Sequence, residues 1–248
     1  MPYEKALVLI GPTTTGKTEV AFEVAKRTQG EIVNGDRYYL FDAFPITSGF
    51  SDTLKLHQET GVPIHLYQVL NHHDEFPKDP DFFEMVNKKV HFLLERGVLP
   101  IVEGCTVGLL PCMQQYNYTV HMLYNPMITL AWDSDVTAEL LKDRIRKRID
   151  RMIAEGAIDE VRRYMALGYK DTLLRVYDMI ISPTADDLES GEPIDIDSLK
   201  TDIAKFCFDD AVRQLEFCRK GEGDVLVMPH NPANLEGTVE RIIEMLGR

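Results

Sequence analysis

The sequence lacks the features that mark membrane and secreted proteins. No apolar run approaches the roughly 20 residues that a helix needs to cross a bilayer. The four cysteines show no C-x-x-C spacing, so neither a zinc site nor a redox motif is indicated. The opening stretch MPYEK does not have the form of a signal peptide. These absences predict a cytoplasmic protein with reduced thiols and no membrane partner.

Positive charge is also scarce. The chain has 27 Lys and Arg residues against 40 Asp and Glu residues, which gives a formal net charge of −13 at pH 7. A protein that grips a long nucleic acid usually presents a basic face. The charge balance therefore favours small-molecule substrates, although a local basic patch within an acidic chain is not excluded. We expect a monomer.

The stretch GPTTTGKT at residues 11–18 fits the full G-x-x-x-x-G-K-[ST] pattern of a phosphate-binding loop. An apolar run at 6–10 predicts a buried strand before it, and 18–27 predicts a helix after it. The glycines let several backbone N–H groups face one anion, and the helix N-terminus adds partial positive charge. Lys17 supplies a full charge, and the Thr18 hydroxyl can bind Mg²⁺. The motif indicates a bound phosphate chain without saying which one.

Strand and helix patterns alternate through the first half of the chain. This alternation predicts an α/β fold, with a P-loop NTPase-like parallel sheet flanked by helices. Further strands are predicted at 31–35, 98–104 and 127–132, a helix at 81–96, and a less regular stretch at 36–80. The apolar face of the helix at 81–96 is predicted to consist of Phe82, Met85, Val86, Phe92 and Leu93.

The second half is predicted to be mainly helical, with a late strand and a closing helix. The acidic segment at 182–197 is rich in Pro, Gly and Ser and predicts a mobile loop, more readily a connector than a lid. The helices are predicted at 136–167, 171–181, 199–220 and 233–247, and the strand at 224–229. We predict an α/β core at 1–135, a helical region that closes the site at 136–222, and a strand and helix that return to the core at 223–248.

Two carboxylates follow predicted strands. Asp36 comes directly after the second strand, and Glu103 ends the next one. Because ligands of open parallel sheets collect at the carboxyl ends of the strands, Asp36 can bind Mg²⁺ or act as a general base, or it can simply cap a turn. Glu103 can help hold Mg²⁺ or orient Lys17, or pair with an arginine. Thr106, in the following turn, can donate to a phosphate or a nucleotide.

The stretch RIRKRIDRM places Arg144 and Arg148 on one face of a predicted helix. Such a run usually means a solvated charged face. A bound diphosphate, however, carries more charge than Lys17 alone can neutralise, and one arginine closing over it would bind in bidentate fashion. Both interpretations stay open on the residues alone.

Other users of a phosphate loop fit less well. Beyond Asp36 the chain has no apolar strand that ends in Asp, and it has no N-K-x-D motif, so GTPases and motor proteins are disfavoured. A nucleotide or metabolite kinase and a non-catalytic nucleotide-binding module remain open.

Taken together, the motifs resemble the isopentenyltransferase family, whose members move a dimethylallyl group from a diphosphate to N6 of adenine. The chain is similar in size to the bacterial adenylate isopentenyltransferases, and PIVEGCTVGLLPCM resembles a stretch of theirs. The stretches ALGYKD and AVRQLEFCRK look more like the tRNA-modifying branch. The resembling elements, in order, are GPTTTGKT, VNGDRYY, TSG at 47–49, PIVEGCTVGLLPCM, RIRKRIDRMIAEGAIDEV, ALGYKD and AVRQLEFCRK.

The resemblance implies a role for each candidate residue. Asp36 would take the N6 proton, and Arg144 would stabilise the departing diphosphate. The implied catalytic residues are Asp36, Thr13 and Arg144. The implied diphosphate-binding residues are Gly11, Thr14, Thr15, Gly16, Lys17 and Thr18, with Thr18 also on Mg²⁺. The acceptor-binding candidates are Arg37, Ser48, Glu103 and Thr106.

Two departures from the family pattern bear on the acceptor. Tyr39 stands where the family often has Gln, three residues after Asp36. The tRNA-modifying members also carry a helical insertion between the equivalents of Leu110 and Met127, where this chain has a short connector. We therefore expect Mg²⁺-dependent prenyl transfer from dimethylallyl diphosphate to AMP or a related adenine nucleotide, which gives a cytokinin precursor. A tRNA dimethylallyltransferase is the alternative.

Overall fold

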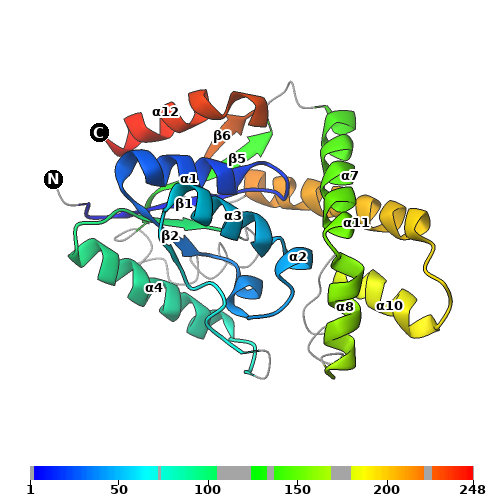
Figure 1. Cartoon of the computed structure of the whole chain (residues 1–248). Coiled ribbons are helices and arrows are strands. Elements are labelled where there is room, and N and C mark those ends of the chain that lie inside the picture. Colours follow the sequence, from blue (N-terminus) through cyan, green and yellow to red (C-terminus); the bar gives the residue numbers. More distant parts are fainter. Residues whose placement is uncertain are drawn as a thin grey trace.

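A six-stranded parallel sheet forms the centre of the computed structural model, which describes residues 3–71, 74–104, 124–132, 137–168, 180–220 and 225–247. The strand order is β3-β2-β4-β1-β5-β6 (Figure 1). The predicted α/β fold with a parallel sheet flanked by helices is confirmed. The strands are β1 (Ala6–Ile10), β2 (Glu31–Asn34), β3 (Ile64–His65), β4 (Pro100–Glu103), β5 (Tyr124–Trp132) and β6 (Val225–His230).

Strand β1 is buried on both faces, because its side chains alternate between two cores. Leu7 and Leu9 pack with α1 (Lys17–Thr28) and α12 (Leu235–Leu246) on one face of the sheet. The intervening side chains pack with α4 (Asp79–Glu95) on the other face (Figure 1). This period of two in a continuous apolar run is typical of a central parallel strand. It fixes where the phosphate loop begins.

The stretch 36–80 is more regular than predicted. It contains η1 (Arg37–Leu40), α2 (Pro45–Ser48), α3 (Phe50–Thr60) and strand β3. Helix α3 lies on the surface and buries only two side chains, Phe50 and Thr53, so its apolar periodicity is weak. Strand β3 is two residues long, which is too short for a sequence pattern.

The prediction for 182–197 is wrong over most of its length. Residues from Ile181 to Ser190 form helix α10, and α11 (Ile196–Lys220) begins soon afterwards. Pro183 lies in the first turn of α10, where the backbone N–H that proline lacks would have no partner within the helix. Thr184 and Ala185 are buried, so one face of this acidic segment belongs to a core.

Helix α4 forms where predicted, but one residue of its predicted apolar face, Phe92, is not buried. Phe92 is 47% exposed, whereas Val90 is fully buried. The positive side chains of Lys89 and Arg96 lie against the Phe92 ring, with 4.9 and 5.3 Å to its centroid. Cation–π contact of this kind lets an aromatic ring remain at the surface.

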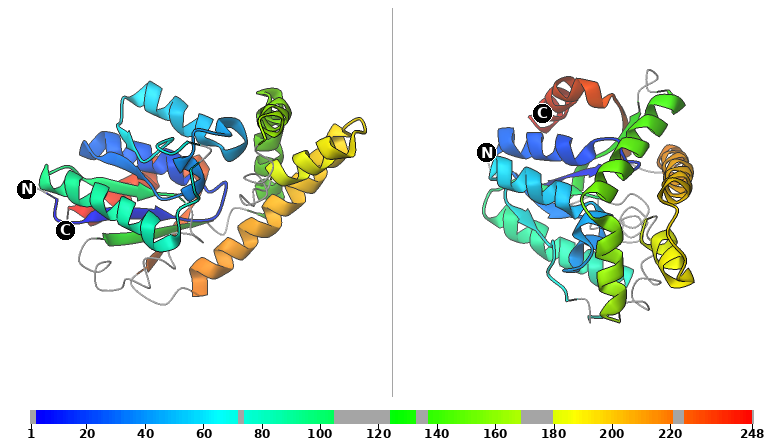
Figure 2. Two further views of the ribbon diagram at one scale, coloured as in Figure 1. Left: turned by 90° about the horizontal axis from the view of Figure 1, so that it is seen from below. Right: turned by 45° about the vertical axis from the view of Figure 1, so that its right-hand side comes forward.

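A layer of helices lies beside the sheet and has its own core (Figure 2). It consists of α7 (Ala138–Ala154), α8 (Ala157–Ala166), α10 and α11. The predicted helix at 136–167 is two helices, because Gly156 adopts a left-handed conformation (φ 102°) between α7 and α8. The helix predicted at 171–181 lies mostly outside the described residues. Within the described ranges, no helix is long and apolar enough to cross a membrane.

Glu160 of α8 joins the helical layer to the core. Its side chain is buried, and its carboxylate accepts hydrogen bonds from the N–H of Ile46 (3.0 Å), the N–H of Thr47 (2.8 Å) and the Thr47 hydroxyl (2.8 Å). These donors lie in the short helix α2. Glu160 therefore fixes the turn that carries Ser48 and Gly49.

We expect Glu160→Ala to lower the free energy of unfolding by about 2–4 kcal/mol, because it leaves buried donors without an acceptor. Urea denaturation followed by circular dichroism measures this change. Glu59→Ala, at an exposed position of α3, is the control and should change the free energy by less than about 0.5 kcal/mol. Equal effects of the two substitutions would contradict a structural role for the Glu160 carboxylate.

Candidate functional site

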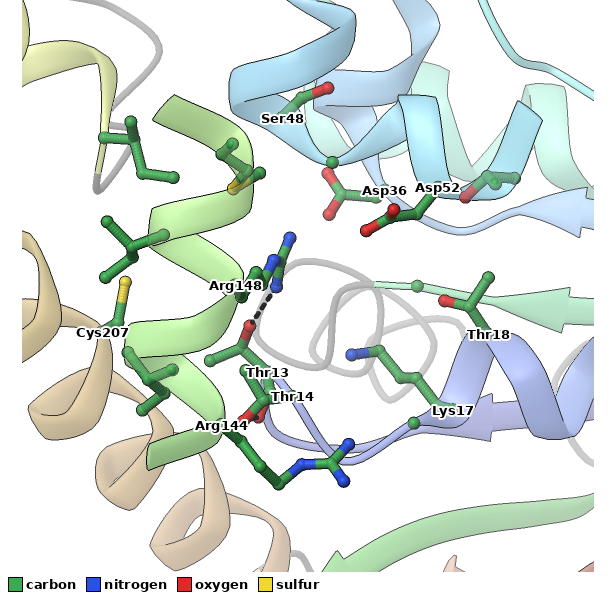
Figure 3. Close-up of a pocket in the computed structure, with 18 of the residues that line it drawn as sticks. Thr13, Thr14, Lys17, Thr18, Asp36, Ser48, Asp52, Arg144, Arg148 and Cys207 are labelled. Atoms are coloured by element: carbon green, nitrogen blue, oxygen red, sulfur yellow. Dashed lines mark hydrogen bonds between the residues drawn. The ribbon is translucent and has the colours of Figure 1, made fainter. Parts of the chain in front are cut away.

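A cavity of about 780 Å³ opens at the carboxyl ends of β1, β2 and β4. The phosphate loop, the turn after β2, helices α2 and α3, and helices α7 and α11 line it (Figure 3). Its volume lies in the range of small-molecule sites, which run from about 300 to 1,000 Å³.

The phosphate loop depends on glycine at two positions. Gly11 has φ 155°, and a Cβ there would lie 2.6 Å from the carbonyl oxygen of Leu130 on β5. Gly16 is left-handed (φ 85°) at the start of α1. The loop therefore turns tightly from β1 into α1. Lys17 follows at once and points into the cavity in Figure 3.

Three of the loop threonines line the cavity and one does not. Thr13, Thr14 and Thr18 face it, as expected. Thr15 is fully buried, and its hydroxyl donates to the carbonyl oxygen of Pro12 at 2.9 Å. The Thr15 side chain thus stabilises the shape of the loop and does not line the cavity, in contrast to the expectation that it binds the diphosphate.

Asp36 follows β2 and lines the cavity, and it is also a turn cap. Its Oδ1 accepts from the N–H of Tyr38 at 3.0 Å, which starts η1. The buried Asn34 side chain binds both the N–H (2.7 Å) and the carbonyl oxygen (2.8 Å) of Asp36. Burial raises the pKa of Asp36, and the Tyr38 hydrogen bond and the charges of Lys17 and Arg37 oppose this rise. The result is a fixed carboxylate of raised basicity.

Glu103 ends β4 and is 1% exposed. Among the residues that the structure describes, its hydrogen-bond partners are two hydroxyl groups and no arginine: Thr18 Oγ1 donates to Oε2 at 3.3 Å, and the Tyr67 hydroxyl donates to Oε1 at 3.1 Å. Burial raises the pKa of Glu103, the charge of Lys17 lowers it, and the nearby Asp36 raises it. Two desolvated carboxylates therefore share the positive charge of Lys17.

Gly104 lets the two strand ends approach each other. A Cβ there would lie 2.7 Å from the backbone carbon of Gly35 and 2.9 Å from the N of Asp36, and its φ is 147°. Because only glycine fits this position, β4 and the turn after β2 can carry Glu103 and Asp36 at one edge of the sheet.

The donor set fits Mg²⁺. The Thr18 hydroxyl, Glu103 and Asp36 offer hard oxygen ligands, and Thr18 touches Glu103 directly. Among the described residues no three His, Cys, Asp or Glu side chains come together. Mg²⁺ usually binds through one or two protein groups together with substrate phosphate oxygens and water, so Thr18 and a carboxylate are the residues that could hold it here.

Helix α7 brings both arginines of the predicted pair to the cavity. Arg148 Nη1 donates to Thr13 Oγ1 at 3.1 Å (Figure 3). A Cβ on Gly49 would lie 2.5 Å from Arg148 Nη2, so the glycine makes room for the guanidinium. The buried Nε atoms of Arg144 and Arg148 have no hydrogen-bond partner within the described part of the chain. The solvated-face interpretation holds for Arg146, which is exposed, and is wrong for this pair.

An apolar wall lies beside the arginines. On α7 the wall consists of Ile145, Ile149 and Met152, each of which directly follows an arginine in the sequence. Phe206 and Cys207 of α11 continue the wall. This wall was not predicted from the sequence, although the stripe on α7 has the period of an amphipathic helix. One end of the cavity is therefore charged and one side is apolar.

The acceptor-binding candidates are placed differently from one another. Ser48 lines the cavity beside Gly49. Arg37 does not; its guanidinium lies 5.3 Å from the centroid of the Phe76 ring and donates to the carbonyl oxygen of Pro77 at 3.5 Å. Thr106 lies outside the described residues, as does nearly all of the short connector between Leu110 and Met127.

Sequence reasoning missed several further residues of the cavity. Tyr39, at the position of the family's Gln, lines it and stacks on Tyr67 with 5.8 Å between ring centroids. Arg151 of α7 and Asp52 of α3 form an ion pair of 2.6 Å among the lining residues. Gln214 of α11 also lines the cavity and accepts from the Thr13 N–H at 3.0 Å. The helix at 199–220 was predicted within the region expected to close the site, and its AVRQ motif was noted, but no residue of it was given a role in the site.

Known proteins resemble this chain in sequence over part of its length. A tRNA dimethylallyltransferase of Anoxybacillus flavithermus is 37% identical over 105 residues, which are 42% of this chain and 32% of that protein. The chloroplastic adenylate isopentenyltransferase 3 of Arabidopsis thaliana is 26% identical over 176 residues, which are 68% of this chain and 49% of that protein. The alignments thus span about a third to a half of these relatives.

The fold has solved counterparts. The full-length tRNA isopentenylpyrophosphate transferase of Bacillus halodurans superposes with a TM-score of 0.80 at 20% identity, covering 99% of this chain and 97% of that one. The sequence model of the isopentenyl transferase family matches residues 4–182, which include the phosphate loop, Asp36, Glu103 and the arginines of α7. The chain therefore belongs to the isopentenyl transferase family.

Proposed function

We propose that the protein transfers a dimethylallyl group from dimethylallyl diphosphate to the N6 amine of a free adenine nucleotide such as AMP, giving a cytokinin precursor. The observation that carries this proposal is one cavity that combines a phosphate loop, an apolar wall and a fixed carboxylate. A diphosphate with a short hydrocarbon tail matches the first two features, and an amine that must lose a proton matches the third.

The charged end suits the donor's diphosphate. Lys17 and the N-terminus of α1 face it from the core, and Arg144 and Arg148 face it from α7. When the allylic C–O bond breaks, negative charge collects on the leaving diphosphate. Donors that already point at this charge lower the barrier without reorganising. Mg²⁺, bound by Thr18 and the diphosphate oxygens, would neutralise part of the same charge.

Asp36 suits the acceptor. The lone pair of the adenine amine is delocalised into the ring, so N6 is a poor nucleophile until a base accepts its proton. In the proposed step the N6–C bond forms, the C–O bond breaks, and the proton passes to Asp36 as diphosphate leaves. A positioned base typically contributes about 10²–10⁴ in rate. Tyr38 and Tyr39 line the cavity near Asp36 and offer aromatic surface to a purine.

A tRNA anticodon adenosine is the second candidate acceptor, because a relative that is 37% identical over 105 residues is a tRNA dimethylallyltransferase. The net charge of −13 and the short connector between Leu110 and Met127 favour the mononucleotide. The kinase alternative has no support from the family, and ATP consumption without prenyl transfer would be its signature.

We expect Lys17→Ala to lower kcat/KM by about 10²–10³-fold and to weaken binding of the donor, because it removes a charge that meets the leaving diphosphate. Steady-state kinetics and calorimetric titration with inorganic diphosphate measure the two effects. Lys26→Ala, at the exposed end of the same helix, is the control. Unchanged kcat and diphosphate affinity in Lys17→Ala would show that the loop does not hold the donor.

Turnover should need the ionised form of Asp36. Because burial raises its pKa, kcat/KM should fall as the pH drops through a value above the usual aspartate range. Asp36→Asn should lower the rate by about 10²–10⁴-fold, abolish this acid limb and leave diphosphate affinity little changed. A pH–rate profile of both proteins checks this, with exposed Asp81→Asn as control. A variant that keeps the parent rate would remove Asp36 from the role of base.

The acceptor is tested by competition. The protein, dimethylallyl diphosphate and Mg²⁺ are incubated with AMP and an anticodon-arm RNA at equal concentration, at low and moderate salt, and prenylated products are measured by mass. We expect prenylated AMP at both salt concentrations. An RNA hairpin needs many phosphate contacts, each of which weakens as salt rises. A salt-sensitive preference for the RNA would make the tRNA enzyme the better proposal.

A further inference from the structure

Thr13 of the phosphate loop is held from two helices of the helical layer. Its N–H donates to Gln214 Oε1 of α11 at 3.0 Å, and its hydroxyl oxygen accepts from Arg148 Nη1 of α7 at 3.1 Å. Gln214 lies 201 residues after Thr13 in the chain. All three residues line the cavity. The contact is therefore a tertiary one, made at the site itself.

Asp210 decides which end of the Gln214 amide faces the loop. Gln214 Nε2 donates to Asp210 Oδ2 at 2.6 Å, one turn earlier on α11. An ionised carboxylate only accepts hydrogen bonds, so the NH₂ end of the amide must face Asp210 and the oxygen must face Thr13. Burial raises the pKa of Asp210, and the charge of Arg213, whose Nη2 lies 3.5 Å from Asp210 Oδ1, together with the Gln214 hydrogen bond opposes that rise. Helix α11 thus presents a single acceptor in a fixed orientation.

These contacts leave one donor of Thr13 for a ligand. A guanidinium has no acceptor atom, so Arg148 uses a lone pair of the Thr13 hydroxyl and not its hydrogen. The N–H of Thr13 is already bound to Gln214, and the helical N–H groups that face an anion begin at Lys17. Thr13 can therefore serve a bound diphosphate through its O–H.

We infer that Asp210 and Gln214 are positioning residues that, together with Arg148, aim the Thr13 hydroxyl at the departing diphosphate oxygen. This inference rests on the proposed function. These three residues, which we term the Thr13 clamp, come from the helical layer, while Thr13 belongs to the core. The docking of α11 against the loop then sets a hydrogen bond that strengthens as charge develops, which is the kind of interaction that raises kcat.

A double-mutant cycle tests the inference. The four proteins are the parent, Gln214→Met, Thr13→Val and the double variant; methionine keeps the length of glutamine and lacks the oxygen. We expect Gln214→Met to lower kcat by about 10–100-fold, because a misaimed donor loses much of its catalytic effect. Calorimetric affinity for inorganic diphosphate should change little. In the Thr13→Val background the same substitution should cost less than about threefold in kcat.

Two further variants separate aiming from folding. Asp210→Asn keeps an acceptor but no longer forces the amide orientation, so its loss in kcat should be smaller than that of Gln214→Met. Asp209→Asn, the exposed neighbour on the same helix, should match the parent. If Gln214→Met costs as much in the Thr13→Val background as in the parent, Gln214 supports the fold and the inference is overturned.

A readout without turnover keeps this inference distinct from the proposed function. Amide hydrogen exchange by NMR should show a Thr13 N–H that exchanges faster in Gln214→Met than in the parent. Unchanged exchange would overturn the contact itself. If exchange responds as expected but the parent transfers no dimethylallyl group, the proposed function and the catalytic role of the clamp fall together, while the contact stands.

Discussion

The geometry of the site depends on the charge of Lys17 beside the carboxylates of Asp36 and Glu103. Burial raises the pKa of both Asp36 and Glu103, and the charge of Lys17 opposes that rise in each. The three side chains meet because β1, β2 and β4 are parallel neighbours whose carboxyl ends lie at one edge of the sheet. Gly104 brings β4 close to the turn after β2, and the left-handed Gly16 lets Lys17 follow the loop directly. A diphosphate bound here would add negative charge to a site that already holds two carboxylates.

The helical layer supplies what the core lacks for such a ligand. Lys17 is the core's one cation among the described lining residues, while α7 adds Arg144 and Arg148 together with the apolar stripe one residue further on. Two hydrogen-bonding side chains attach the layer to the core. Buried Glu160 of α8 accepts from the N–H of Thr47 in α2, and Gln214 of α11 accepts from the N–H of Thr13 in the phosphate loop. Both attachments act at segments that line the cavity, so the geometry of the charged end depends on how α7, α8 and α11 dock. The cavity is in this sense a product of two layers.

The parts of the site that follow from local chain pattern could be predicted from the sequence. A strand, a glycine-rich loop and a helix form one local unit, and a carboxylate after a parallel strand reaches the same edge as that loop, so Lys17, Asp36 and Glu103 were all identified. The contributions of α11 were not, because Gln214 meets Thr13 across 201 residues and nothing in the local pattern records the pairing. Helix α3 escaped prediction because it buries only two side chains, and α10 because its Pro, Gly and Ser content outweighed one buried face.

The cations at the cavity rim bear on the acceptor. Arg151 pairs with Asp52 at 2.6 Å, and Lys147 pairs with Asp143 at 2.7 Å, both at exposed positions. Exposed ion pairs contribute about 0–1 kcal/mol, so one phosphate group can replace a carboxylate partner at little cost. A mononucleotide needs only one such replacement of a carboxylate by its phosphate group. A folded RNA gains affinity only from many cations that are free to meet its phosphates, and the gain from each shrinks where an aspartate competes for it. Under the proposed function, the acidic partners of Arg151 and Lys147 therefore support an acceptor with one phosphate group over one with a long phosphate backbone.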